Sequence, residues 1–147
     1  MPAEIIIEEI QTPQALRQAQ AIREQIFVAE QGIPRDLEQD GLDAASIHVL
    51  VRCDGAPAAT GRLTMASEGE GVLARIAVLP AYRGQGLGKR VVQHLETLAR
   101  REGLVTVSLK PHHYLEDFYQ KMGYTTVPGS FSAAGPHPLI MMTKSLS

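Results

Sequence analysis

Three glycines at alternate positions constrain this sequence more than any other feature. Gly84, Gly86 and Gly88 lie in the stretch YRGQGLGK, between a strand-like run and an amphipathic pattern that ends at Arg101. Each glycine costs conformational entropy and adds no side chain to a core, so their clustering indicates that another group approaches the backbone. The first N–H groups of a helix are unpaired and favour anions. The sequence therefore predicts a strand, a phosphate-binding glycine loop and a helix that begins at Gly86.

Two common phosphate-binding motifs do not match this loop. A Walker A motif ending at Lys89 would need a glycine at position 83 and Ser or Thr at position 90, and the chain has arginine at both. The dinucleotide fingerprint would need its third glycine at Val91 or at Lys89, depending on where it begins. The loop therefore fits neither motif.

The whole chain, residues 1–147, predicts one domain in which strands and helices alternate. A β-branched strand at residues 4–10 is followed by a helix that Thr12 caps and that ends at Gly32. The dipeptide DG then separates two alternating segments, which is typical of a β-hairpin. The apolar run IAVL (residues 76–79) predicts a strand near the middle of the sheet with both faces covered. After the glycine loop come a helix, a strand, a short helix and two closing strands, which indicates an α/β layer structure.

Composition and charge narrow the classes of function. The 147 residues are 44% hydrophobic and 20% charged with a net charge of −2, so the sequence lacks the basic surface of a nucleic-acid-binding domain. No apolar run is long enough to span a membrane, and the N-terminal MPAEIIIEEI lacks the basic segment of a signal peptide. Cys53 is the only cysteine, which excludes an internal disulfide. We therefore expect a cytoplasmic protein without nucleic-acid or membrane partners.

Two motifs resemble the GNAT superfamily of acyl-CoA N-acyltransferases. The segment RGQGLG at residues 83–88 is similar to its Arg/Gln-x-x-Gly-x-Gly/Ala signature, and FYQKMGY at residues 118–124 is similar to its late FYxxxGF element. The predicted strand order also matches, so the resemblance extends over nearly the whole chain. It implies a GNAT fold of the α/β (α+β) class, with a central mixed, twisted sheet of about six to seven strands and helices on both faces.

The resemblance also implies an acetyl-CoA site. The diphosphate would bind the backbone amides of residues 83–89, and the pantetheine arm would run beside residues 76–78. The Val78 N–H would polarise the thioester carbonyl, and the Tyr119 hydroxyl would protonate the leaving thiolate. The residues alone also allow Tyr119 to be a core aromatic beside Phe118. The implied coenzyme site comprises Ile76, Ala77, Val78, Arg83, Gly84, Gln85, Gly86, Leu87, Gly88, Lys89, Phe118 and Tyr119.

A closer resemblance to the small bacterial ElaA-like GNAT proteins implies where the acceptor binds. It rests on the segment IREQIFVAEQ, the acidic stretch after it and the ending FSAAGPHPLIMM. Glu30 and His48 are the candidates for the general base. Other interpretations stay open: Arg23 and Glu30 as an exposed pair on one helix face, and His48 as a histidine that only opens a strand. The implied acceptor pocket comprises Arg23, Phe27, Glu30, Gln31, His48, Arg75 and His137.

Two arginines on neighbouring predicted strands, Arg62 and Arg75, also allow two interpretations. They would bind an anionic group of the acceptor, or an acidic partner in residues 35–46, which we expect to form a solvated loop or a loose helix. No metal site is expected, because His112, His113 and His137 lack the spacing of zinc ligands.

Together these features predict an N-acetyltransferase that transfers an acetyl group from acetyl-CoA to a primary amine by direct attack on the thioester. The alternative is a non-catalytic acyl-CoA-binding or sensor module of the same fold. The acceptor would be a small-molecule amine or a protein amine, and the sequence does not decide its charge. The two closing strands would leave a sheet edge through which two copies could form a homodimer.

Overall fold

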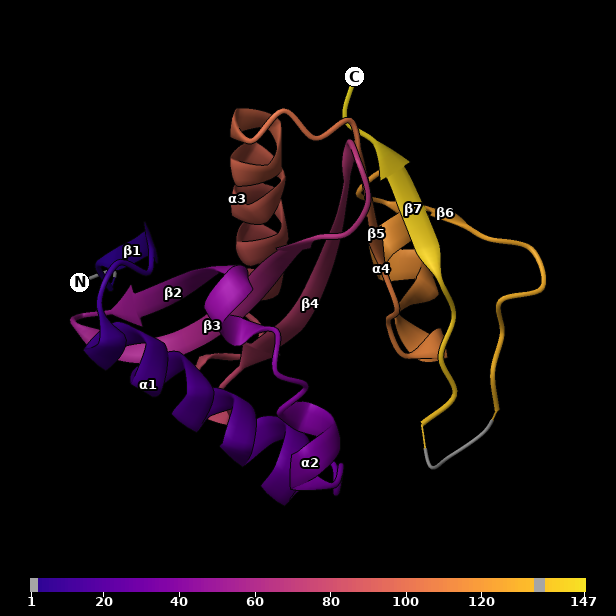
Figure 1. Ribbon diagram of the computed structural model, residues 1–147. Helices are drawn as coiled ribbons and strands as arrows, with labels where there is room; N and C mark the ends of the chain where they lie inside the picture. Colours follow the sequence, from indigo (N-terminus) through magenta and orange to yellow (C-terminus); the bar gives the residue numbers. More distant parts are fainter. Residues whose placement is uncertain (1–2, 134–136) are drawn as a thin grey trace.

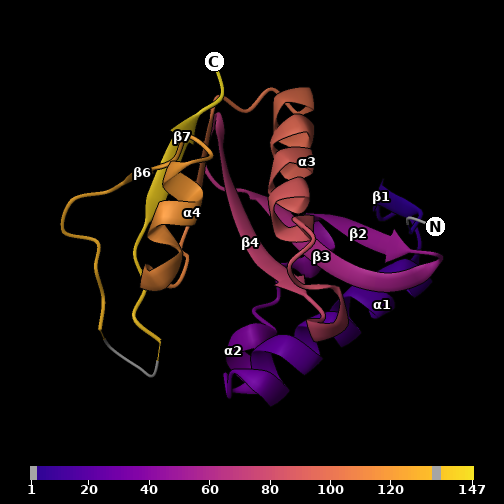
Figure 2. The ribbon, with the colours of Figure 1, turned by 180° about the vertical axis from the view of Figure 1, so that it is seen from behind.

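A seven-stranded mixed sheet forms the centre of the protein in a computed structural model, which describes residues 3–133 and 137–147. The strand order is β1-β2-β3-β4-β5-β7-β6, and β4–β5 is its parallel pair. Figures 1 and 2 show the sheet and its helices from two opposite sides. The predicted mixed sheet and the predicted order of elements are confirmed.

The strands are β1 Ile5–Glu9, β2 Ile47–Cys53, β3 Ala56–Met65, β4 Glu70–Val78, β5 Thr106–Leu109, β6 Thr125–Thr126 and β7 Met142–Ser145. The helices are α1 Pro13–Arg23, a π-helix at Glu24–Glu30, α2 Arg35–Glu38, α3 Leu87–Arg101 and α4 Glu116–Gln120, with 3₁₀ turns at Asp43–Ala45, Pro80–Tyr82 and His113–Leu115. None of the helices in the described residues is long and apolar enough to cross a membrane.

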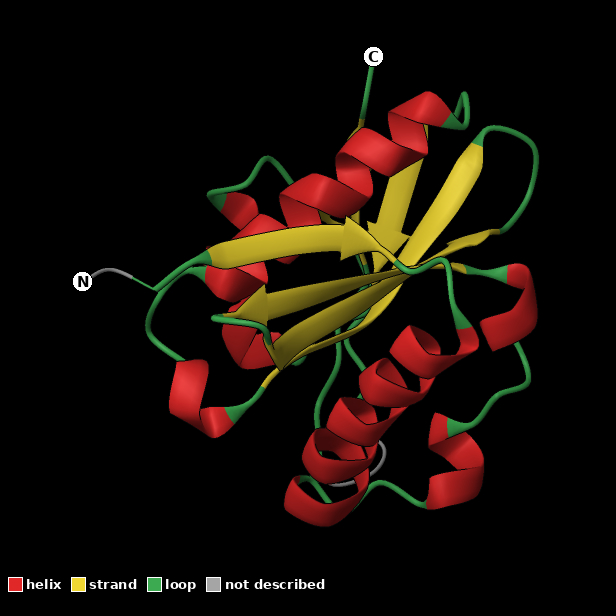
Figure 3. Ribbon diagram, turned by 90° about the vertical axis from the view of Figure 1, so that its left-hand side faces the viewer, coloured by secondary structure: helices red, strands yellow, loops and turns green. Residues whose placement is uncertain are grey.

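Helices cover both faces of the sheet, as the sequence predicted (Figure 3). On one face α1 packs Ala19 and Ile22 against Leu50 of β2. On the other face α3 packs Val91 against a cluster that includes Val49, the residue before Leu50 on the same strand. Neighbouring residues of a strand point to opposite faces, so β2 contributes to both apolar layers. The buried Cys53 belongs to the second cluster as a small core residue.

The N-terminal helix is only partly α-helical, which corrects the prediction of one continuous α-helix. Thr12 caps it as predicted, since its Oγ1 accepts a hydrogen bond from the Ala15 N–H at 3.1 Å. From Glu24 to Glu30 the helix has π geometry, and Gly32 follows its end with a φ of 71°. A π turn holds one more residue than an α turn and therefore redirects the side chains that follow, a feature often found at functional sites.

The two edges of the sheet are β1 and β6 among the described residues. β7 lies between β5 and β6 and pairs with both. The closing strands therefore leave an edge at β6, as predicted, whereas β7 is paired on both sides. A homodimer formed through an edge stays a prediction.

Candidate functional site

β4 and β5 pair only at their beginnings and then diverge (Figure 1). Their parallel register joins Glu70–Val72 to Thr106–Ser108. β4 continues to Val78 and stays paired with β3 on its other side. Beyond Val72, the edge of β4 that faces β5 therefore presents backbone N–H and C=O groups that β5 does not pair. An open strand edge of this kind can accept a further extended chain.

The run IAVL lies at the centre of the sheet and packs against the apolar clusters on both of its faces, as predicted. Ala77 is buried, whereas Ile76 and Val78 are only half-buried. The half-buried residues are those that the sequence assigned to the pantetheine arm.

The Val78 backbone faces the open edge. The next residue, Leu79, donates its N–H to the Ala58 carbonyl on the β3 side at 2.9 Å. Because successive residues of a strand alternate in direction, the N–H and C=O of Val78 point away from β3. The Val78 carbonyl indeed accepts a hydrogen bond from Arg83 Nε at 3.1 Å. The predicted donor to a thioester carbonyl is therefore directed into the gap between β4 and β5.

A β-bulge distorts β4 just before this point. Arg75 and Ile76 of β4 together face the single residue Gly61 of β3. Arg75 has a φ of 56°, which is uncommon for a residue other than glycine. This backbone directs the Arg75 side chain to the end of α2, where it donates to the carbonyls of Leu37 and Glu38 at 3.3 and 3.1 Å. The bulge thus both shapes the open edge and fixes α2 beside it.

The glycine loop leads from β4 into α3 and is open to solvent. Gly84 and Gly86 have φ values of 83° and 75°, which favour glycine, and a Cβ at either would meet no atom within 4 Å. The first α3 N–H bonded back to the loop belongs to Arg90, which donates to Gly86 at 3.2 Å. The N–H groups of residues 87–89 precede it at the positive end of the helix dipole. The loop therefore has the properties of an anion site, as the sequence predicted.

Arg83 joins the glycine loop to the end of the π-helix. Its guanidinium pairs with the Glu30 carboxylate at 3.0 Å, in addition to its bond to the Val78 carbonyl. The two side chains are 44% and 42% exposed, so this ion pair can exchange its partners at little cost. The expected exposed pair of Glu30 with Arg23 is wrong, because Arg23 is buried and faces residues 35–46.

Three buried or half-buried arginines bind the acidic segment at residues 35–46. This segment forms the short helix α2 and a 3₁₀ turn, which matches the predicted loose helix and not the predicted loop. Arg62 and Arg75 bind an acidic partner within the chain, which was one of the two predicted alternatives. We call the six ion-paired residues the arginine cluster: Arg23, Arg62 and Arg75 with Glu38, Asp40 and Asp43. Contacts of Arg23 and Arg75 with an acceptor stay a prediction.

Asp43 is the member of the arginine cluster that binds two arginines, Arg23 and Arg62. Burial by itself would raise the pKa of its carboxyl group, but hydrogen bonds from Gln20, Arg23 and Arg62 outweigh it and lower the pKa to about 2. Next to it, His48 Nε2 lies 2.9 Å from the Asp43 carbonyl oxygen and donates to it. Burial lowers the pKa of His48, and the Asp43 carbonyl and charge oppose this effect. These contacts give His48 a structural role, and its role as a base stays a prediction.

Tyr119 lies in the core at the inner face of α4. It is 5% exposed, and its ring meets Phe118 and Tyr124 edge to face at centroid distances of 4.9 and 5.7 Å. Burial raises the pKa of Tyr119 to about 12, so its hydroxyl is protonated at neutral pH. This hydroxyl makes no hydrogen bond with another described residue. Tyr119 is thus both a core aromatic and a hydroxyl able to donate a proton or a hydrogen bond.

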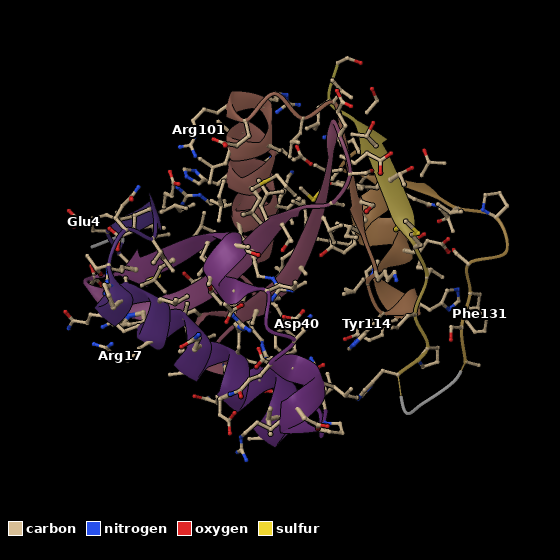
Figure 4. The ribbon with its side chains drawn as sticks, in the orientation of Figure 1. Glu4, Arg17, Asp40, Arg101, Tyr114 and Phe131 are labelled. Carbon is tan, nitrogen blue, oxygen red and sulfur yellow. The ribbon has the colours of Figure 1, made fainter. Side chains whose placement is uncertain are left out.

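A cleft of about 340 Å³ opens beyond the end of β5. We call it the histidine cleft, and His112, His113, Tyr114, Phe131, His137 and Pro138 line it. The rings of His112 and His137 stack at 5.0 Å and 8°, and His137 Nε2 donates to the Gln31 carbonyl at 2.8 Å. Figure 4 shows Tyr114 near the middle of the view and Phe131 at its right-hand margin, both away from Arg101. The structure thus brings two predicted acceptor residues, Gln31 and His137, into contact.

The sequence assigned His137 to the acceptor site but did not assign His112 or Phe131. The available signal was the presence of exposed ring residues in two polar connections, one before α4 and one between β6 and β7. Gly135 and Pro136, which belong to the motif at the ending, lie outside the described residues. Within the described residues, no group of three or more His, Cys, Asp or Glu side chains could hold a metal ion.

The amino-acid sequence is similar to those of known proteins. A family model described as "Acetyltransferase (GNAT) family" matches residues 13–124. The uncharacterized N-acetyltransferase YjcF of Bacillus subtilis (strain 168) is similar to this chain, with 35% identity over 128 residues that cover 86% of this chain and 91% of that protein.

Solved structures share the fold over almost the entire chain. An acyl-CoA N-acyltransferase from Pseudomonas aeruginosa has 28% identity and a TM-score of 0.84, covering 97% of this chain and 99% of its own. Escherichia coli ElaA has 24% identity and a TM-score of 0.80 with the same coverage of 97% and 99%. An aminoglycoside 6'-N-acetyltransferase complexed with coenzyme A has 17% identity and a TM-score of 0.78, covering 97% of both chains. At their lower identities the last two show a common fold only.

Proposed function

Because the chain belongs to the acetyltransferase (GNAT) family, we propose that it transfers an acetyl group from acetyl-CoA to a primary amine. The observation that carries this proposal is the open edge of β4, which runs directly into the glycine loop and the free N–H groups of α3. The edge of β4 offers backbone hydrogen bonds to an extended molecule, and the glycine loop that follows it offers an anion site. Acetyl-CoA carries its thioester, pantetheine arm and diphosphate in that order. A protein of the same fold binds coenzyme A, which supports the assignment.

The residues present fit the coenzyme without rearrangement of the loop. The positive φ values of Gly84 and Gly86 leave the space above the loop free of side-chain atoms. The N–H groups of residues 87–89 would hold the diphosphate, and the exposed Lys89 would add charge. The backbone of Ile76 and Val78 would bind the pantetheine amides as a strand does.

The chemistry is an acyl transfer that needs no nucleophile from the protein. Acetyl-CoA supplies the acetyl group as a thioester. The neutral nitrogen of the acceptor attacks the carbonyl carbon, so a C–N bond forms as the C–S bond breaks. The Val78 N–H would stabilise the charge that develops on the carbonyl oxygen. The nitrogen loses one proton to Glu30, His48 or water, Tyr119 would give one to the sulfur, and the products are the acetylated amine and a free thiol.

Arg83 and Glu30 connect coenzyme binding to acceptor binding. A diphosphate at the glycine loop would compete with Glu30 for the Arg83 guanidinium, since phosphate is a strong partner for arginine. The present pair is exposed, so this exchange is inexpensive. Glu30, once released, would be a carboxylate beside the transfer site that can bind the ammonium group of an acceptor.

The test is an acetylation assay with a panel of amines, in which the free thiol and the mass of the acetylated product are both measured. Acetyl-CoA without amine is the control for hydrolysis. We expect thiol release that depends on the amine and matches the acetylated product. If the protein binds acetyl-CoA but acetylates no amine, the transferase proposal fails and the non-catalytic binding module is favoured.

A further inference from the structure

The histidine cleft is lined by rings and, while its imidazoles are neutral, carries no formal charge. No Lys, Arg, Asp or Glu is among the described residues that line it. Tyr114 and Phe131 are 77% and 55% exposed. Large aromatic side chains that gather at one exposed site mark a surface for a ligand or partner. A volume of about 340 Å³ suits a small molecule.

The cleft lies beside the proposed transfer site. His112 follows β5 beyond the point where β5 has left β4, and Tyr114 belongs to the turn that leads into α4. His137 reaches the opposite wall, where it donates to the carbonyl of Gln31. Gln31 is the neighbour of Glu30 in the chain. A small molecule with its rings in the cleft could therefore present an amine to Glu30.

The charged groups on the α2 side of the site already pair with one another. Each of the three arginines of the arginine cluster binds at least one of its three carboxylates, so the charges within the cluster balance. A phosphate or carboxylate on an acceptor would have to break these pairs, and so would a polyamine. Glu30 is the carboxylate that coenzyme binding would release. This arrangement favours an acceptor with one ammonium group and no anionic group.

We infer that the acceptor is a primary monoamine that bears an aromatic ring, and this inference rests on the proposed function. The ring binds in the histidine cleft against Tyr114, Phe131 and the stacked imidazoles of His112 and His137. The amine extends toward Glu30 and the open edge of β4. Edge-to-face and stacked contacts of this kind distinguish a flat ring from a saturated ring of similar size.

The experiment compares four acceptors in the free-thiol assay: phenethylamine, cyclohexylethylamine, spermidine and glucosamine phosphate. The first two have the same carbon skeleton, and they differ in that the ring is aromatic and flat in one and saturated and puckered in the other. Phe131→Ala removes a wall of the cleft, and Val105→Ala is the matched control because Val105 is an exposed apolar residue just before β5. We expect phenethylamine to have the highest kcat/KM. Phe131→Ala should lower the kcat/KM for phenethylamine about tenfold without changing the KM for acetyl-CoA. Val105→Ala should change neither of these two constants.

The outcomes separate this inference from the proposed function. Equal kcat/KM for the two ring amines, or a preference for spermidine or glucosamine phosphate, overturns the inference while the proposed function stands. If acetyl-CoA binds but no amine reacts, NMR line broadening of the two ring amines decides: selective binding of phenethylamine supports the aromatic cleft, and its absence overturns it. If acetyl-CoA does not bind at all, the proposed function fails and the inference fails with it.

Discussion

Asp43 holds two buried arginines at once, and its replacement by asparagine tests whether the arginine cluster stabilises the protein. Its carboxylate accepts hydrogen bonds from Arg23 at 2.9 Å and from Arg62 at 3.0 Å. These two arginine side chains are 1% and 3% exposed. Asparagine has the same shape without the charge, so each guanidinium would stay buried with one carboxylate fewer. A buried charge that loses a partner is destabilising.

The pKa of Asp43 gives the magnitude. Burial opposes the effect, but the hydrogen bonds from Gln20, Arg23 and Arg62 lower the pKa from 3.8 to about 2. This difference corresponds to about 2 kcal/mol of stability. Because the folded-state pKa lies below the unfolded-state value, this stability is fully present at neutral pH. It decreases as the pH falls from about 4 toward about 2, and about half of it is lost at about pH 3.

Urea unfolding at neutral pH and at about pH 3 measures this contribution. We expect Asp43→Asn to lower the free energy of unfolding by about 2 kcal/mol at neutral pH and by about 1 kcal/mol at about pH 3. Asp36→Asn is the control, since Asp36 is exposed in the same segment and forms no ion pair with another described residue. It should change stability by less than about 0.5 kcal/mol. Equal stability of Asp43→Asn and wild type, or a difference that does not shrink in acid, would refute the reasoning.

Three further predictions concern the turnover of Tyr119→Phe, the stability of Gly61→Ala and the pKa of His112. Tyr119→Phe should lower kcat for acetyl transfer by about 10–100-fold with an unchanged KM for acetyl-CoA, and an unchanged kcat would remove Tyr119 from the mechanism. Gly61→Ala would place a Cβ 2.5 Å from Val91 Cγ1. It should therefore destabilise the protein by about 1–3 kcal/mol in thermal unfolding, and an unchanged Tm would contradict the close approach of β3 and α3. Burial and the neighbouring His137 lower the pKa of His112 from 6.5. An NMR titration should show that the pKa of His112 lies below 6.5 and that it rises in the His137→Asn variant. A His112 pKa above 6.5 would contradict the stacking of the two imidazoles.

Sequence predicted most of the fold because its signals are local. The glycine pattern, the hairpin at Asp54 and Gly55 and the cap at Thr12 each depend on a few neighbouring residues, and the structure confirms all three. The glycine loop likewise has the backbone geometry of an anion site, since the first turn of a helix needs no distant partner to leave its N–H groups unpaired. For this reason the residues of the loop could be named from the sequence, and their binding of acetyl-CoA stays a prediction.

The acceptor side depends on contacts between distant residues. Arg83 and Glu30 are 53 positions apart, and His137 and Gln31 are 106 positions apart. A list of charged residues indicates that pairs will form but not which ones, so Arg23 was assigned to the acceptor and not to residues 35–46. The π-helix was not predicted either, because its seven residues are too few to establish an apolar period different from that of an α-helix.

The most direct test of the account is calorimetric binding of acetyl-CoA to the wild type and to two variants at Gly86. Gly86→Asn and Gly86→Asp have the same shape, both tolerate a positive φ better than most residues, and only aspartate adds a negative charge to the anion site. Nothing lies within 4 Å of a Cβ at this position, so both variants should fold. The account predicts that one acetyl-CoA binds per wild-type chain and that Gly86→Asp binds at least about tenfold more weakly than Gly86→Asn. Equal binding to the two variants, or no binding to the wild type, would contradict the assignment of the glycine loop to the coenzyme diphosphate.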